Sequence, residues 1–374
     1  MTLREIADVI TKGTTPTTLG YDFQDEGINF LKIECFDEAG NYLGNCAHIS
    51  EKCNEKLSRS KLQENDILFS IAGAIGRVAI VTEDLLPANT NQALAIIRIS
   101  GDEVYLPYIK LILQSGIVRR QFEKQKQGVA QLNLSLKNIG DLIIPLFSKE
   151  RQMEFVELFS KVQVLIDNRR SQLVELDTLI KARFVEMFGD PIQNEKNWSR
   201  RSLEQLCHSI VDCPHSTPNY ISEDTGFMCI RTSVVKKNKI LWDEIEYIVE
   251  DEFNQRIQRK RPEKGDIVYT REGAILGIAA IIDRNCNVAL GQRSMLLSPD
   301  SSVCTSEFIC TAMNSDSFLS NALRGISGSA SPHINVGDIK SFEMIAPPLE
   351  LQRKFSEFNS QVDKLKFVET IARF

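Results

Sequence analysis

The chain has 374 residues, of which 43% are hydrophobic and 25% charged, a composition typical of folded proteins large enough for two domains. Its formal net charge of −6 weakly disfavours a free-standing nucleic-acid binder, and no apolar run approaches the ~20 residues of a membrane span. Nine cysteines without a CxxC pair indicate reduced thiols, and the charged start MTLREIADVITKG argues against a signal peptide, so we expect a cytoplasmic protein.

The first part of the chain mixes strand and helix patterns. An amphipathic stretch at Leu3–Ile10 leads into a polar turn rich in Thr, Pro and Asn. Apolar and β-branched runs then predict a sheet, with one helix and one loop late in the segment. The expected strands are Ile28–Ile33, Asp66–Ile71, Arg77–Val81, Leu94–Ile99 and Leu142–Pro145, the helix is Tyr105–Phe122, and the loop is Gly128–Leu134.

A long helix is predicted from Lys149 to Gly189, because this stretch has no internal Pro or Gly before Gly189. Its apolar residues recur in alternating steps of three and four, which place them in one seam suited to packing on another helix. About 40 residues would make a rod of roughly 60 Å. A comparable, shorter seam near the end of the chain predicts an antiparallel partner; it comprises Leu351, Phe355, Phe358, Val362, Leu365 and Ile371.

The second part of the chain repeats the first at an offset of 200 residues. KLQENDILFSIAGAI at Lys61–Ile75 returns as RPEKGDIVYTREGAI at Arg261–Ile275, and one inserted residue shifts Gly76 to Gly277. Further pairs keep the offset: Gln92 and Gln292, Gly128 and Gly328, Ile139 and Ile339, Gln152 and Gln352, Phe155 and Phe355. A duplicated unit of interspersed strands and helices, without repeated βαβ units, predicts an α+β fold.

The predicted elements of the second copy follow the same order. The strands are Met228–Thr232, Asp266–Thr270, Ile278–Ile282, Ser294–Leu297 and Phe342–Pro348, the helix is Ser306–Leu323, the loop is Gly325–Asn335, and Leu203–Ile210 is the opening stretch. The two copies differ between Thr14 and Glu55 and between Asp212 and Arg259. A shared scaffold with divergent segments is what two binding surfaces of different specificity would require.

These residues resemble a known family. Asn65-Asp66-Ile67-Leu68-Phe69-Ser70…Gly73…Gly76 and Gly265-Asp266-Ile267-Val268…Gly273…Gly277 are similar to the strand-turn-strand of type I restriction-modification specificity subunits. Ile139–Gln152 and Ile339–Gln352 resemble the segments that lead into the conserved helices of that family. Arg183–Pro191 resembles the end of the central helix, and Trp198 with Leu203 the start of a second target recognition domain.

The resemblance implies two similar target recognition domains, residues 1–147 and 191–347, separated by two long antiparallel helices, residues 148–190 and a shorter 348–374, with a pseudo-twofold repeat. Each domain would read one half of a bipartite double-stranded DNA site, and the helices would set the spacer. The implied partners are two methyltransferase subunits, which use S-adenosylmethionine on adenine N6, and restriction subunits, which use ATP and Mg²⁺. The chain itself would hold no cofactor, span no membrane and catalyse no reaction.

Several motifs also have simpler interpretations. The glycine pairs Gly73/Gly76 and Gly273/Gly277 lack the following Gly-Lys-Ser/Thr of a phosphate loop, which favours structural turns. Cys207, His208, Cys213 and His215 could suggest zinc, but the first copy has no equivalents and the spacing is irregular, so we expect no metal site. No nucleophile elbow accompanies the four histidines.

DNA contacts would fall on basic and amide side chains near the glycine turns. Basic runs are usually solvated faces, yet their place inside the repeated bodies fits phosphate contacts, and acidic residues concentrate elsewhere. Amides and arginines on loops suit base readout, although a structural role for the shared Gln92 and Gln292 is at least as plausible. The candidates are Ser70, Arg77, Asn91, Gln92, Lys126, Gln127, Gln131, Arg231, Lys236, Lys237, Arg271, Gln292 and Arg293.

Two alternatives from other functional classes stay open at this point. The chain could be a stand-alone nuclease or hydrolase with an unrecognised site, which would cleave DNA by itself with a metal ion. It could also be a protein adaptor that binds no DNA, which would select no sequence from a random pool.

Overall fold

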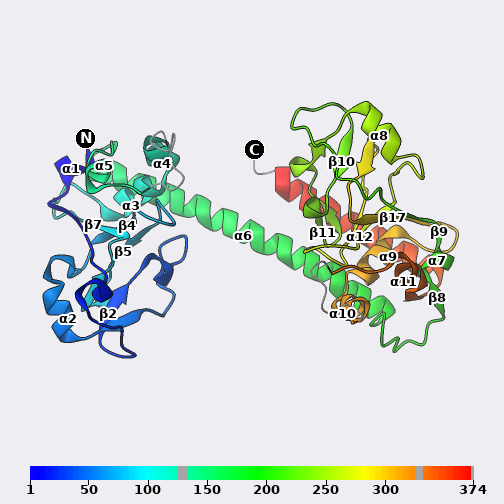
Figure 1. The fold of residues 1–374 in the computed structure, drawn as a ribbon, viewed down its shortest axis with the longest axis horizontal. Coiled ribbons are helices and arrows are strands. Elements are labelled where there is room, and N and C mark those ends of the chain that lie inside the picture. The colour runs from blue at the N-terminus through cyan, green and yellow to red at the C-terminus, as the bar shows by residue number, and fades with distance from the viewer. Residues whose placement is uncertain (124–132, 325–331, 372–374) are drawn as a thin grey trace. The chain divides into compact units, whose positions relative to one another are not determined.

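The computed structural model describes residues 1–123, 133–324 and 332–371, with side chains to residue 366 (Figure 1). The contacts within it divide the chain into two compact units, Met1–Ile166 and Asp167–Phe374. The boundary falls inside one long helix, Lys149–Phe188.

The first unit contains a four-stranded and a three-stranded sheet, covered by short helices. Its strands are β1 (Val9–Lys12), β2 (Ile28–Leu31), β3 (Ala47–Ile49), β4 (Ile67–Ser70), β5 (Val78–Ile80), β6 (Ala88–Thr90) and β7 (Leu94–Arg98). Its α-helices are α1 (Leu3–Ile6), α2 (Glu51–Lys56), α3 (Leu106–Gln114), α4 (Gly116–Glu123), α5 (Leu136–Gly140) and the first part of α6 (Lys149–Phe188).

The main sheet of the first unit is antiparallel, in the order β1-β7-β4-β5. One of its faces packs on α3 and α4 through Phe69, Ile97, Ile109 and Phe122. In the three-stranded sheet β2 lies between β3 and β6; it is antiparallel to β3 and parallel to β6. The divergent residues between Thr14 and Glu55 supply β2 and β3, so this smaller sheet carries most of the sequence that differs between copies.

The second unit repeats both sheets. Its strands are β8 (Arg200–Ser202), β9 (Cys207–Asp212), β10 (Met228–Ile230), β11 (Val235–Lys236), β12 (Lys239–Ile240), β13 (Glu246–Tyr247), β14 (Ile267–Thr270), β15 (Ala279–Ile281), β16 (Val288–Leu290), β17 (Ser294–Pro299) and β18 (Glu343–Ile345). Its α-helices are the end of α6, α7 (Leu203–Leu206), α8 (Glu250–Arg256), α9 (Ser306–Met313), α10 (Asp316–Leu323), α11 (Val336–Ser341) and α12 (Leu349–Ile371).

The strand register of the two main sheets is the same. In the first unit Ile67 pairs with Ile97 and Ser70 with Leu94; in the second, Ile267 pairs with Leu297 and Thr270 with Ser294. The main sheet of the second unit has the order β9-β17-β14-β15, which matches β1-β7-β4-β5 of the first unit strand for strand. The predicted α+β fold with an internal repeat is therefore confirmed at the level of residue pairing.

The end of α6 and the start of α12 pack antiparallel within the second unit. Phe184 and Phe188 of α6 contact Phe355 of α12, with ring centroids 5.5 and 5.6 Å apart. Further along both helices, Lys366 pairs with Asp177 at 2.7 Å. Because higher numbers on α12 meet lower numbers on α6, the expected antiparallel seam is present here.

Some predicted elements are shorter or divided. The helix expected over Tyr105–Phe122 is two helices, α3 and α4, because Ser115 adopts extended backbone and ends the first. The helix expected over Ser306–Leu323 likewise divides at Ser315, which caps α10. Leu142–Pro145 is no strand and makes only a single bridge through Ile143 to Thr2. The expected loops at Gly128–Leu134 and Gly325–Asn335 lie mostly outside the described residues.

None of the helices within the described ranges is long and apolar enough to cross a membrane.

Candidate nucleic-acid interface

At one end of each main sheet, four segments meet around the glycine turn. In the first unit the turn after β4 is held to the β6–β7 turn by the Ile71 N–H, which donates to the Ala93 carbonyl at 2.8 Å. The divergent segment joins them where Thr14 N–H donates to the Thr90 carbonyl at 3.1 Å. The late loop returns to the same place, since Leu134 N–H donates to the Ile71 carbonyl at 3.0 Å.

The second unit builds the same junction. Arg271 N–H donates to the Arg293 carbonyl at 3.0 Å, and Ile334 N–H donates to the Arg271 carbonyl at 2.8 Å. We call the place where these four segments meet the turn junction. In the first unit it comprises the glycine turn (71–77), the amide turn (91–93), the start of the divergent segment (13–15) and the end of the late loop (133–134). The corresponding ranges in the second unit are 271–277, 291–293, 213–217 and 332–334. A shared backbone frame therefore carries different side chains in the two copies.

The glycines form tight turns at this junction. Gly73, Gly76, Gly273 and Gly277 all have positive φ, between 68° and 92°. A Cβ on Gly277 would lie 2.5 Å from Cδ1 of Leu319 and would displace the end of that side chain. No helix begins at either turn, which agrees with the structural interpretation of these glycines.

The shared glutamines connect the conserved turn to the divergent segment. Gln92 accepts hydrogen bonds through Oε1 from the N–H and the hydroxyl of Thr15, the former at 3.1 Å. Gln292 accepts one from the Thr217 hydroxyl at 3.2 Å. Asn91 accepts through Oδ1 from the Ala93 N–H at 3.1 Å, and the buried Ser70 hydroxyl donates to the Ala72 carbonyl. As they lie here, these candidates hold the junction together.

Most of the candidate cations have acidic or carbonyl partners. Arg231 pairs with Glu246 at 3.0 Å and lies over the Tyr220 ring, Lys237 pairs with Asp316 at 2.9 Å, and the Arg77 guanidinium donates to the Phe36 carbonyl. Lys237 consequently lies beside the start of α10. Lys126, Gln127 and Gln131 lie outside the described residues.

Arg271 is buried and cannot present its guanidinium to DNA as it lies. Its Nε and Nη2 donate to the two carboxylate oxygens of Asp212 at 2.9 and 3.1 Å, and it is 7% exposed. The same carboxylate lies 3.2 Å from Nε2 of His215, whose side chain is 68% exposed. Arg271 and Asp212 thus lie beside the exposed imidazole of His215 at the start of the divergent segment. From the sequence alone, His215 comes into question only as a possible metal ligand.

Arg293 is exposed and lies at the centre of the second junction. Its φ of 73° is unusual for a residue with a Cβ, and part of its side chain passes close to Gly273. Within the described parts of the chain Arg293 has no ion pair, and neither has the exposed Lys236. The guanidinium of Arg293 therefore lies at the second junction without an ion pair among the described residues. The first copy has Ala93 at the equivalent position.

In the cysteine and histidine cluster, Cys207 and Cys213 pack in the core, whereas His208 and His215 are exposed. Burial raises the pKa of Cys207 to about 12 and also raises the pKa of Cys213, which keeps both thiols protonated. Cys213 Sγ accepts from the Ser294 N–H at 3.3 Å. Across the residues that the structure describes, no group of three or more His, Cys, Asp or Glu could hold a metal ion.

Comparison with known proteins places this fold in a class. A solved chain from work on complex assembly and conformational transition of a type I R-M system matches with a TM-score of 0.62 at 17% identity, over 100% of this chain and 92% of that one. The two chains therefore share a fold.

The sequence comparisons show the family. The profile of the "type I restriction modification DNA specificity domain" matches residues 1–176 and again 195–372. The chain belongs to this family, which confirms the resemblance seen in its sequence.

Two curated relatives agree with this. The EcoBI specificity subunit of a type I restriction enzyme from Escherichia coli is 31% identical over 156 residues, which are 41% of this chain and about a third (32%) of that protein. The MjaVIII specificity subunit from Methanocaldococcus jannaschii is 22% identical over 324 residues, 81% of this chain and 73% of that one.

Proposed function

We propose that the chain is the DNA-specificity subunit of a type I restriction-modification complex. The observation that carries this is the turn junction, built twice on one hydrogen-bonded frame and furnished with different side chains in each copy. A duplicated reader with divergent contacts suits a bipartite DNA site with two different halves. Residues 1–147 would read one half, and residues 191–347 the other.

The chemistry would belong to partner subunits. Two adenine methyltransferase subunits would supply S-adenosylmethionine and flip the target adenines into their own pockets. Restriction subunits would supply ATP hydrolysis with Mg²⁺. This chain, a cytoplasmic protein, would contribute position and sequence preference, and the helices of residues 148–190 and 348–374 would fix the spacer.

The test is a methylation map. The chain is co-expressed with an adenine methyltransferase subunit of a type I system from the same source, in a host that lacks other adenine methylation, and N6-methyladenine is mapped by single-molecule sequencing. We expect one bipartite motif with an unread spacer, and no methylation when this chain is omitted.

Other outcomes would favour the alternatives. Methylation without any sequence motif would favour a protein adaptor. Metal-dependent cleavage of DNA by the purified chain alone would favour a nuclease.

A further inference from the structure

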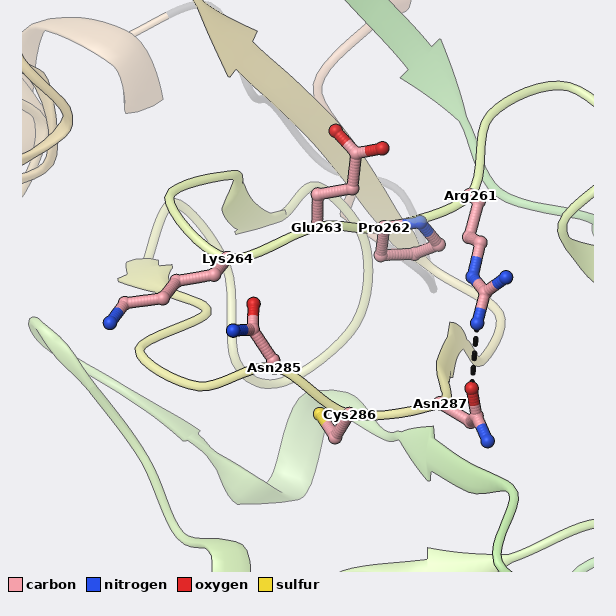
Figure 2. Close-up of a pocket in the computed structure, with 7 residues that line it drawn as sticks. All are labelled: Arg261, Pro262, Glu263, Lys264, Asn285, Cys286 and Asn287. Carbon is pink, nitrogen blue, oxygen red and sulfur yellow. Dashed lines mark hydrogen bonds between the residues drawn. The ribbon is translucent and has the colours of Figure 1, made fainter.

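The second unit has a pocket that the proposed half-site reading does not use. It lies between residues 261–264, which lead into β14, and residues 285–287, which lead into β16 (Figure 2). Its volume is about 440 Å³. Both segments reach the ends of their strands away from the turn junction, because the junction forms where β14 and β16 finish.

The pocket carries uncompensated positive charge. Arg261 is held in place, since its Nη2 donates to Asn287 Oδ1 at 2.6 Å and its guanidinium lies 6.0 Å from the Phe253 ring centroid. Lys264 is exposed and has no ion pair among the residues described. The one acidic lining residue, Glu263, is already paired with Lys260 at 3.0 Å and points away from Asn285 and Asn287.

The lining suits a phosphate group better than a base or a peptide. Arginine, lysine and carboxamide side chains are the usual donors to phosphate oxygens. No aromatic side chain lines the pocket on which a base could stack, and Pro262 and Cys286 are its only less polar members. A protein partner would be expected to find a more apolar centre with aromatic anchors.

The first copy does not build this pocket. At the equivalent positions it has Lys61 and Glu64, so one cation is replaced by an acid. The loop that corresponds to 285–287 ends in apolar residues, and its Leu85 is 3% exposed in the core of the first unit. The pocket is therefore a property of the second body alone.

We propose that this pocket binds a phosphate of the DNA backbone that flanks the second half-site, away from the turn junction. The proposal rests on the proposed function, and assigns to Arg261 and Lys264 a sequence-independent role in affinity and register. A free phosphate compound shares the same chemistry, so the experiment separates the two sources.

The main variant is Lys264→Glu, which reverses an exposed charge without touching the Arg261–Asn287 bond; Arg261→Ala is the second. Each is assembled with the methyltransferase subunits, and affinity is measured by fluorescence anisotropy from low to moderate salt, on the methylated motif and on a scrambled duplex. The control is Lys61→Glu in the first body. It makes the same lysine-to-glutamate change as Lys264→Glu, at the position that corresponds to Arg261.

We expect both pocket variants to weaken binding to the two duplexes by the same factor. The slope of log affinity against log salt should fall by about one for the loss of one phosphate contact. The Lys61→Glu control should retain the wild-type slope. The ratio between motif and scrambled duplex should not change.

An unchanged slope in both pocket variants would overturn the proposal, as would loss of affinity for the motif alone. Saturable binding of inorganic phosphate to the wild-type complex, abolished by Lys264→Glu without any change in DNA affinity, would assign the pocket to a free phosphate compound and also overturn it. A wild-type complex without sequence preference would instead remove the proposed function, and the slope on the scrambled duplex would still test the pocket.

Discussion

Residues shared by the two copies mainly hold the frame. Asp66 and Asp266 accept from the N–H of the residue three positions earlier, Gln63 and Glu263, at 2.8 and 2.9 Å. Gln92 and Gln292 tie the amide turn to the divergent segment. Some side chains at the junctions differ between the copies, such as the exposed Arg293 against the half-buried Ala93. Specificity should therefore be sought among the differences.

Arg293 is the first position to test. Arginine pairs with guanine through two hydrogen bonds in the major groove, and losing such a contact costs about 1–3 kcal/mol. We expect Arg293→Gly to relax the preference at one base pair of the second half-site, roughly 5- to 150-fold. The measurement is the methylation rate on duplexes substituted at each position of the motif.

The thermal stability of Arg293→Gly shows whether the change in preference comes from a folding defect. Glycine adopts φ near 73° without strain, so the thermal unfolding midpoint of the second unit should be equal to or above that of the wild type. A lower midpoint, or weaker preference at several positions of both half-sites, would show that Arg293 supports the structure instead of reading a base.

The sequence located the junction residues but not their partners. Gln92, Gln292 and Arg293 could be chosen because the repeat aligned them with the glycine turns. The pairing of Arg271 with Asp212 joins residues 59 positions apart, and Lys237 with Asp316 joins residues 79 apart. Such pairs depend on how strands and helices come together, which no local pattern encodes. As a result, some of the basic residues chosen as DNA-contact candidates, such as Arg271 and Lys237, form ion pairs within the protein.

At the scale of elements, a buried glutamine fastens each long helix to its body. Gln152 is fully buried, accepts from the Tyr105 N–H at 2.8 Å, and donates to the carbonyls of Glu103 and Phe147 at 2.9 and 2.7 Å. Gln352 accepts from the Thr305 N–H at 3.0 Å and donates to the Pro347 carbonyl at 2.8 Å. The first turn of α6 and of α12 is thereby fixed to the start of α3 and α9.

Replacing either glutamine by leucine should loosen this attachment. Gln352→Leu leaves a buried N–H and a buried carbonyl without partners, at about 1–3 kcal/mol each. We expect a lower urea midpoint for the second unit and faster hydrogen exchange at the Thr305 amide. Gln172→Leu, on an exposed face of α6, is the control. Wild-type exchange at Thr305 in the Gln352 variant would contradict this role.

The pattern of apolar residues predicted the helices well where they are long. The helix expected over residues 149–189 is α6 at Lys149–Phe188, because forty residues without Pro or Gly leave no local reason to end. The divisions at Ser115 and Ser315 were missed, since in each case apolar spacing continues across the break. The three-stranded sheets were also missed in part, because their parallel pairing joins β2 to β6 and β10 to β16 across long loops.

At the scale of the whole molecule, α6 belongs to both units. Its apolar residues are buried at Ile180, Phe184 and Phe188, in the core of the second unit, and exposed at Leu158, Val162 and Leu165. A single helix shared by two readers would couple the length of the helix to the spacing of the half-sites. Changes in its length should then leave each reader intact.

Deleting Arg169–Gln172 tests this coupling. Four residues shorten a helix by about 6 Å, which is close to two base pairs, and keep the apolar seam nearly in phase. We expect the methylated motif to keep both half-sites and to lose one or two base pairs from its spacer. The measurement is the same methylation map, with the four residues replaced by alanines as the length-matched control.

The control should reproduce the wild-type motif, because helix length is unchanged. Exchange of residues 191–347 for those of a relative is a second comparison, and it should alter one half-site and preserve the spacer. If the deletion changed a half-site, or if the exchange changed both, the two bodies would not act as separate readers joined by one helix. An unaltered spacer after the deletion would show that another part of the complex sets the distance.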